Sequence, residues 1–122
     1  MKYKIRGLRE PGNLEKERVA IEILEDGDAG KLVVTSTIQQ GPDNVSPRIK
    51  DPYWIPDQEV KMGDLVIVYT KKGQNNVRKN NDDTTSYFFY MGLTNALYDE
   101  NNKTAAVFSI AKWTFARREE SV

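Results

Sequence analysis

The chain of 122 residues contains no cysteine and no histidine. Without cysteine there is no disulfide framework and no thiolate nucleophile, and without both residue types the usual structural zinc sites are excluded. The lack of histidine also removes Ser-His-Asp triads and acid–base catalysis by imidazole. We therefore expect neither a bound metal nor a cofactor.

Net charge and long apolar runs are missing as well. Eighteen basic and eighteen acidic residues cancel, which removes the bulk attraction that general nucleic-acid or anionic-membrane binders use. No run approaches the roughly 18 apolar residues of a membrane span, and residues 1–6 do not resemble the start of a signal peptide. These absences predict a cytoplasmic protein with no membrane span.

What the chain does contain is the hydrophobic pattern of an all-β domain. Residues 18–24 alternate Val19, Ile21 and Ile23 with polar or small residues, the period of two of a half-buried strand. Further strands are expected over residues 4–8, 31–38, 65–69, 87–91 and 104–110, with a short final run over 113–115. Seven to nine strands with no long amphipathic helix are typical of a β-sandwich or a small barrel.

The architecture that we predict is a sandwich of two antiparallel sheets in a single domain, residues 1–116, followed by a charged tail over 117–122. Its core strands are 65–69, 87–91 and 104–110, and the first of these is apolar enough to be covered on both faces. Gly63 precedes that strand and is expected to have a positive φ in a turn. Residues 39–52 contain three prolines, which predict a loop or an edge strand.

The aromatic run over residues 87–91 must divide between two faces. Alternation sends Tyr87, Phe89 and Met91 to one side and Phe88 and Tyr90 to the other, and at least one set should pack inward. If Tyr87 and Phe89 were on the outside together with Tyr69, they would form an apolar patch that marks an interface.

A polar segment over residues 71–85 is the candidate binding site. We expect residues 74–85 to be a mobile, exposed loop, and the segment combines four cations with a flanking aromatic residue: Lys71, Lys72, Arg78, Lys79 and Tyr87. Cations beside aromatics are typical of single-stranded nucleic-acid binding, although surface loops also carry such charges for solubility. The neutral chain makes another protein the favoured partner and nucleic acid the alternative.

Two acidic or hydroxyl-rich segments could suggest other chemistry. The acidic residues within 22–28 lack the ligand pattern of an EF-hand loop, so a solvated turn is the better interpretation. Residues 82–86 contain two aspartates next to hydroxyl side chains, but adjacent aspartates in a polar loop should both stay ionised rather than divide acid and base roles. We therefore expect that the protein is not an enzyme.

The central part of the chain resembles the lamin-tail domain. The resemblance spans roughly residues 19–115 and is best over 53–108, where the motifs are Trp54-Ile55-Pro56, Lys61-Met62-Gly63-Asp64, the strand 65–69, Lys72-Gly73, Phe88-Phe89-Tyr90-Met91, Ala96-Leu97-Tyr98-Asp99 and Thr104-Ala105-Ala106-Val107. It implies an immunoglobulin-like sandwich and a remote prokaryotic or phage member of the family. Lamin-tail domains are non-catalytic parts of hydrolases, nucleases and filament proteins, so the resemblance implies a binding or scaffolding module.

The function predicted from the sequence is therefore a non-catalytic binding or interaction module. The alternatives are a structural or self-assembling subunit and a weak nucleic-acid-binding protein that uses residues 71–85. The oligomeric state stays open at this point.

Overall fold

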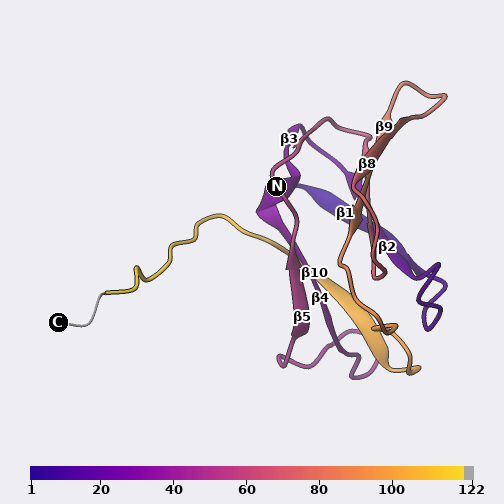
Figure 1. The fold of residues 1–122 in the computed structure, drawn as a ribbon, viewed down its shortest axis with the longest axis vertical. Coiled ribbons are helices and arrows are strands. Elements are labelled where there is room, and N and C mark those ends of the chain that lie inside the picture. The colour runs from indigo at the N-terminus through magenta and orange to yellow at the C-terminus, as the bar shows by residue number, and fades with distance from the viewer. Residues whose placement is uncertain (120–122) are drawn as a thin grey trace.

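Strands make up almost all of the regular structure in residues 1–119, the part of the chain that the computed structural model describes (Figure 1). In chain order the elements are β1 (Tyr3–Arg9), β2 (Arg18–Ile23), β3 (Gly27–Asp28), the 3₁₀ turn η1 (Ala29–Lys31), β4 (Leu32–Ile38), β5 (Lys50–Trp54), β6 (Glu59–Val60), β7 (Leu65–Tyr69), β8 (Asn76–Lys79), β9 (Thr85–Tyr90) and β10 (Lys103–Ser109). The predicted all-β fold is confirmed, with ten strands in the described residues instead of seven to nine.

The strands form a sandwich of two main sheets. One sheet has the order β1-β2-β7-β9-β8, the other has the order β10-β4-β5, and β3 and β6 form a small separate pair. Figure 1 shows β4, β5 and β10 on one side and β1, β2, β8 and β9 on the other. The prediction that both sheets are antiparallel is wrong at one place, because β7 and β9 are parallel. The chain leaves β7, passes over to the outer strand β8, and returns as β9 between the two.

The core lies between the two sheets. Val19, Ile21 and Ile23 of β2 are buried as their alternation predicts, and they face Leu32 and Val34 of β4 across the sandwich. Burial of a side chain of this size contributes about 1.5–3 kcal/mol, so these layers supply most of the stabilising free energy.

Strand β7 differs from its predicted burial. Val66 and Val68 are buried, whereas Leu65, Ile67 and Tyr69 are only partly covered. The strand therefore has one core face and one outer face.

The turn before β7 is built as the sequence predicts. Gly63 has a φ of +94°, and its N–H donates to the Ile23 carbonyl over 2.8 Å. The next residue, Asp64, is buried and accepts hydrogen bonds from the N–H of Lys61 at 2.8 Å and of Thr85 at 2.9 Å. One carboxylate thus fixes the turn and the start of β9 together.

The two main sheets also meet along one side, where β1 approaches β10. The Tyr3 hydroxyl donates to the Val107 carbonyl over 2.6 Å, and the N-terminal amine of Met1 donates to Ser109 Oγ over 3.1 Å. These bonds join the first and last strands of the fold.

Two segments differ from their predicted conformation. Residues 76–79, expected within a mobile loop, form the edge strand β8, which pairs with β9 from Asn76–Phe88 to Lys79–Thr85. Residues 111–119 form no strand, so the run over 113–115 adds none to the sheets. The first part of the predicted tail lies in this segment, and residues 120–122 lie outside the described residues.

Candidate functional site

The outer face of the five-stranded sheet carries a stack of aromatic rings. The parallel register of β7 and β9 places Tyr69 beside Tyr90, and their ring centroids lie 5.3 Å apart with an interplanar angle of 11°. Phe88 lies on the same face, 6.5 Å from Tyr69. Phe88 and Tyr90 are therefore the outer members of the aromatic run.

Cations of the chain itself cover these rings. The guanidinium of Arg18 lies 5.7 Å and the amine of Lys71 lies 5.2 Å from the centroid of Tyr69. Arg78 lies 5.3 Å from the centroid of Phe88. Such contacts stabilise by roughly 0.5–1 kcal/mol at exposed sites. We call these six residues, Arg18, Tyr69, Lys71, Arg78, Phe88 and Tyr90, the cation–aromatic face.

The crossover from β7 to β8 packs on this face. Gly73 lies so close to Tyr90 that a Cβ at this position would overlap the tyrosine ring. The Tyr90 hydroxyl also accepts a hydrogen bond from Asn76 Nδ2 at 3.1 Å. Glycine is required here because the backbone passes directly over the ring, and Tyr90 holds the crossover in place.

The four predicted cations do not act as one group. Lys71 is half-buried and pairs with Glu15 at 3.8 Å, whereas Lys72 is exposed in the crossover. Arg78 and Lys79 are neighbours in β8, so their side chains leave the strand on opposite faces. The structure brings Lys71 and Arg78 to one face of the sheet, and binding by any of the four stays a prediction.

Tyr87, the fifth predicted site residue, lies on the other side of the sheet from Phe88 and Tyr90. It is half-buried and packs against the core, as does Phe89. Tyr87 and Phe89 are therefore not on the outside of the sheet, so they do not form the outer interface that such a position would have marked. The outer patch consists of the other half of the aromatic run.

The hairpin turn between β8 and β9 contains the aspartates that were considered for catalysis. Asp82 Oδ1 accepts hydrogen bonds from Thr84 Oγ1 at 2.5 Å and from Thr84 N at 3.1 Å, and these bonds lower the pKa of the Asp82 carboxyl. Asn80 Nδ2 donates to Thr84 Oγ1 at 3.1 Å and to Ser86 Oγ at 3.0 Å. These polar side chains hold the turn in shape.

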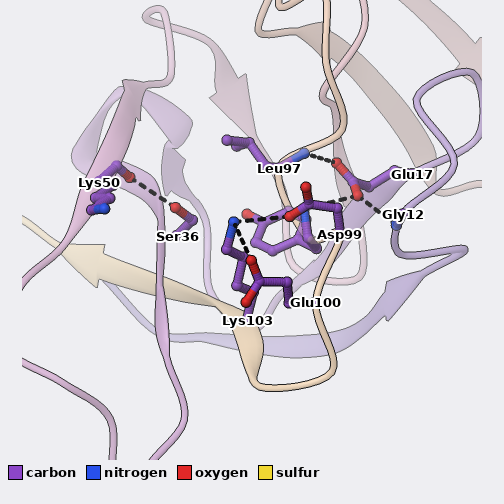
Figure 2. A network of polar contacts seen from close by, with 9 residues as sticks. Gly12, Glu17, Ser36, Lys50, Leu97, Asp99, Glu100 and Lys103 are labelled. Atoms are coloured by element: carbon purple, nitrogen blue, oxygen red, sulfur yellow. Dashed lines mark hydrogen bonds and ion pairs between the residues drawn. The ribbon is translucent and has the colours of Figure 1, made fainter.

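Glu17 is a buried carboxylate at one end of the sandwich (Figure 2). Its Oε1 accepts from the N–H of Gly12 at 2.8 Å and of Tyr98 at 3.0 Å. Its Oε2 accepts from Thr70 Oγ1 at 2.5 Å and from the N–H of Leu97 at 2.9 Å. Hydrogen bonds to a charged group contribute about 1.5–3 kcal/mol. One side chain therefore joins three loops that are far apart in the sequence.

Tyr98 continues this network into the core. Its hydroxyl donates to the Thr35 carbonyl over 3.2 Å, and Thr35 Oγ1 donates to the carbonyl of Ala106 over 3.0 Å. Burial, together with the carboxylates of Glu17 and Asp51, raises the pKa of the Tyr98 phenol. The phenol is thus a neutral structural group at physiological pH.

A small cavity of about 130 Å³ lies next to this network, beside the side chains of Ser36, Arg48, Lys50, Asp51 and Lys103. Lys103 Nζ is already 2.8 Å from Asp99 and 3.8 Å from Glu100. Figure 2 shows both acids turned toward the lysine, and the hydrogen bond from Lys103 lowers the pKa of Asp99. The three cations around the cavity, Arg48, Lys50 and Lys103, are matched in number by three acidic residues, Asp51, Asp99 and Glu100.

The acidic residues within 22–28 also serve the fold. Asp28 Oδ1 accepts from the N–H of Gly30 at 2.7 Å and of Gln58 at 2.9 Å, and Glu22 pairs with Arg6 at 2.7 Å. Among residues 1–119 there is no group of three acidic, histidine or cysteine side chains that could hold a metal ion.

A second aromatic region lies on the outer face of the three-stranded sheet. Val33 of β4 pairs with Phe108 of β10 on one side and with Trp54 of β5 on the other, so the three side chains form a row across the sheet. Phe108 and Trp54 are 46% and 45% exposed. Trp54 is fixed by a hydrogen bond of 2.7 Å from its indole N–H to the Gly30 carbonyl.

Two further aromatic residues of this region come from the segment after β10. Trp113 contacts Trp54 edge to face at 4.8 Å, and Phe115 lies 6.5 Å from Trp113. They are 60% and 70% exposed. We call Val33, Trp54, Phe108, Trp113 and Phe115 the aromatic surface. The sequence alone offers the four aromatic residues of this surface only as part of the larger set of aromatic residues that could in part form a carbohydrate or peptide platform. It does not single them out, because the members of the aromatic surface are spread over four separate segments.

Comparison of the chain with known protein families and with curated protein sequences finds no match. Within residues 1–119 no helix has the length and apolar character needed to cross a membrane.

Proposed function

We propose that the protein is a non-catalytic interaction module that binds another protein through the aromatic surface. The observation that carries this proposal is the exposure of Trp113 and Phe115, at 60% and 70%, beside the half-exposed Trp54 and Phe108. Large aromatic side chains bury about 150–250 Å² each when they are covered and are enriched among the residues that dominate binding free energy. Clustered exposed apolar side chains mark interaction sites.

The use of the polar groups supports the same proposal. The carboxylates of Glu17 and Asp64 are buried and accept hydrogen bonds from the backbone of their own chain, so they are committed to the fold. The resemblance of residues 53–108 to lamin-tail domains also supports it, since those domains are non-catalytic parts of larger proteins. A cytoplasmic location is part of the proposal.

A second candidate function is weak binding of a single-stranded nucleic acid on the cation–aromatic face. Its support is the combination of Tyr69, Phe88 and Tyr90 with three cations on one sheet face, since bases stack on such rings. The same contacts argue against it, because each cation would have to leave its ring. We therefore place it second.

Photo-crosslinking tests the first proposal. A photoreactive amino acid is placed at position 115 in one variant and at position 77 in a control, because Val77 is a comparably exposed apolar residue, at 59%, on the edge strand β8. We expect a crosslinked protein adduct from position 115, either with a different protein or with a second copy, and much less from position 77. Equal labelling at both positions, or none at 115, would contradict the proposal.

A further inference from the structure

The segment after β10 leaves the body of the sandwich. Its last backbone hydrogen bond to the sheet region is from Ile110 N to the Lys31 carbonyl at 2.7 Å, and every residue from 111 to 119 is exposed. Figure 1 shows this segment running away from the two sheets. We call residues 111–119 the arm. An exposed arm with two large aromatic side chains leaves much apolar surface in water.

The arm already shows which surface it prefers. Trp113 packs edge to face on Trp54 at 4.8 Å, at one end of the row that Val33, Trp54 and Phe108 form across the sheet. Phe115 follows two residues later, and its ring lies 6.5 Å from that of Trp113. The contact between Trp113 and Trp54 can form within one chain or between two copies, because every copy offers the same row.

We infer that the arm docks on the Val33–Trp54–Phe108 row of a second copy, so that the protein assembles with itself by exchange of arms. The inference rests on the proposed function of the aromatic surface and names its partner. Exchange of an identical segment between copies reproduces the Trp113–Trp54 contact of the closed chain, and in the pair Phe115 covers part of the row in addition.

The size of the arm fits this role. Nine extended residues reach about 30 Å at roughly 3.3 Å per residue, which is enough to cross from one small domain to the next. Two exchanged arms bring four large aromatic side chains into the interface, and at about 150–250 Å² each they bury roughly 600–1,000 Å². With the rows that receive them, the total reaches the range above about 1,000 Å² that specific interfaces need.

Two further features favour docking on the face of the sheet. Strand β5 is an edge strand of its sheet, but it contains Pro52, which has no N–H for a full added strand. Side-chain contacts with the row are therefore the main means of docking. The formal net charge of zero also removes the self-repulsion that keeps strongly charged proteins apart.

Complementation between two defective chains tests the exchange. The arm variant carries Trp113→Ala and Phe115→Ala, and the row variant carries Trp54→Ala and Phe108→Ser. The mass of each chain and of their mixture is measured by gel filtration with light scattering. Val77→Ala serves as a control, because it removes an equally exposed apolar side chain from the other sheet.

We expect the unmodified chain and the Val77→Ala control to show twice the monomer mass of 14.0 kDa. The arm variant and the row variant should each show the monomer mass. Their mixture keeps one arm on one row instead of two, so the doubled mass should return at a higher protein concentration than in the unmodified chain. If the row variant melts early, Phe108→Ser alone replaces it, because that side chain is half exposed.

A monomer mass for the unmodified chain at all concentrations would overturn the exchange. So would a mixture of the two folded variants that, at the highest concentration measured, is no heavier than either variant alone. A crosslink from position 115 to a different protein, together with a monomer mass, would leave the proposed function in place and reject self-assembly.

Discussion

The two aromatic regions of the molecule differ in what covers their rings. On the cation–aromatic face, Tyr69 and Tyr90 stack on each other and Arg18, Lys71 and Arg78 lie over the rings. On the aromatic surface, Trp113 and Phe115 extend from a segment without secondary structure and stay largely exposed. The rings of the first region are covered within the chain, whereas those of the second have one close contact, between Trp113 and Trp54, and leave most of their apolar surface exposed.

This difference separates residues that serve the fold from residues that are available for binding. Cations beside aromatic residues in the sequence suggested a binding site, but the structure uses two of those cations to cover rings of their own sheet. Variants on the cation–aromatic side should therefore change stability and leave association alone. Variants on the aromatic surface should do the opposite.

The largest effect is expected from Glu17→Gln. The carboxylate accepts four hydrogen bonds in a buried site, and an amide would turn a donor toward those donors. Disrupting a buried, hydrogen-bonded charge costs about 3–5 kcal/mol, and we expect about 3 kcal/mol in urea unfolding with the mass in solution unchanged. A change below about 1 kcal/mol would show that Glu17 does not anchor the end of the sandwich.

A paired comparison of Tyr90→Ala with Phe115→Ala tests the contrast directly. Tyr90 is half-buried between Tyr69 and the crossover, so its removal should cost about 2 kcal/mol, somewhat less than for a fully buried aromatic residue. Phe115→Ala should stay within about 0.5 kcal/mol, as exposed substitutions do. Thermal melts of both variants measure this, and equal losses would remove the distinction between the two regions.

A smaller loss of stability is expected from a substitution at Gly73, where the crossover passes close to the ring of Tyr90. Gly73→Ala should destabilise by about 1–2 kcal/mol, because the added methyl group overlaps the tyrosine ring. In the Tyr90→Ala background the same change should cost almost nothing. A double-mutant cycle measures the coupling, and independent, additive losses would show that the ring is not what requires glycine.

The smallest effect is expected when Lys71, Lys72, Arg78 and Lys79 are all changed to Ser. Two of these cations lie over rings, so the loss should be about 1 kcal/mol, or roughly 4 °C in Tm for a chain of this size. The association measured by light scattering should be unchanged. Loss of association in this variant would show that the four cations predicted from the sequence, and not the aromatic surface, bind the second copy.

Local patterns in the sequence predicted much of the fold. The alternation of Val19, Ile21 and Ile23 identified a core strand, and the glycine before an apolar run identified the positive φ of Gly63. Both signals act over a few residues, so they can be read without knowing the topology. The parallel pairing of β7 and β9 could not, because it depends on where the chain re-enters the sheet.

The site could be predicted much less well for the same reason. The hydrogen-bond partners of Glu17 lie up to 81 residues away in the sequence, so no local sequence pattern predicts them. The sequence pattern did not predict strand β8, because Asn76, Arg78 and Lys79 are polar and give no hydrophobic alternation. The strand forms by backbone pairing with β9 at an exposed edge of the sheet. The aromatic surface combines Trp54 and Phe108, which become neighbours of Val33 only through the register of three strands.

The fluorescence of the two tryptophans shows whether the aromatic surface is the interface between copies. Trp54 and Trp113 are the only tryptophans of the chain, and both belong to the aromatic surface, so their emission reports on that surface alone. We expect the emission to move to longer wavelength on dilution, over the concentration range in which the light-scattering mass falls to 14.0 kDa. In the single chain Trp54 and Trp113 contact each other but stay 45% and 60% exposed, whereas in the pair Phe115 of the second copy covers part of this surface in addition. An emission maximum that stays constant while the mass falls would show that the copies associate through another surface and that the arm does not dock on the row.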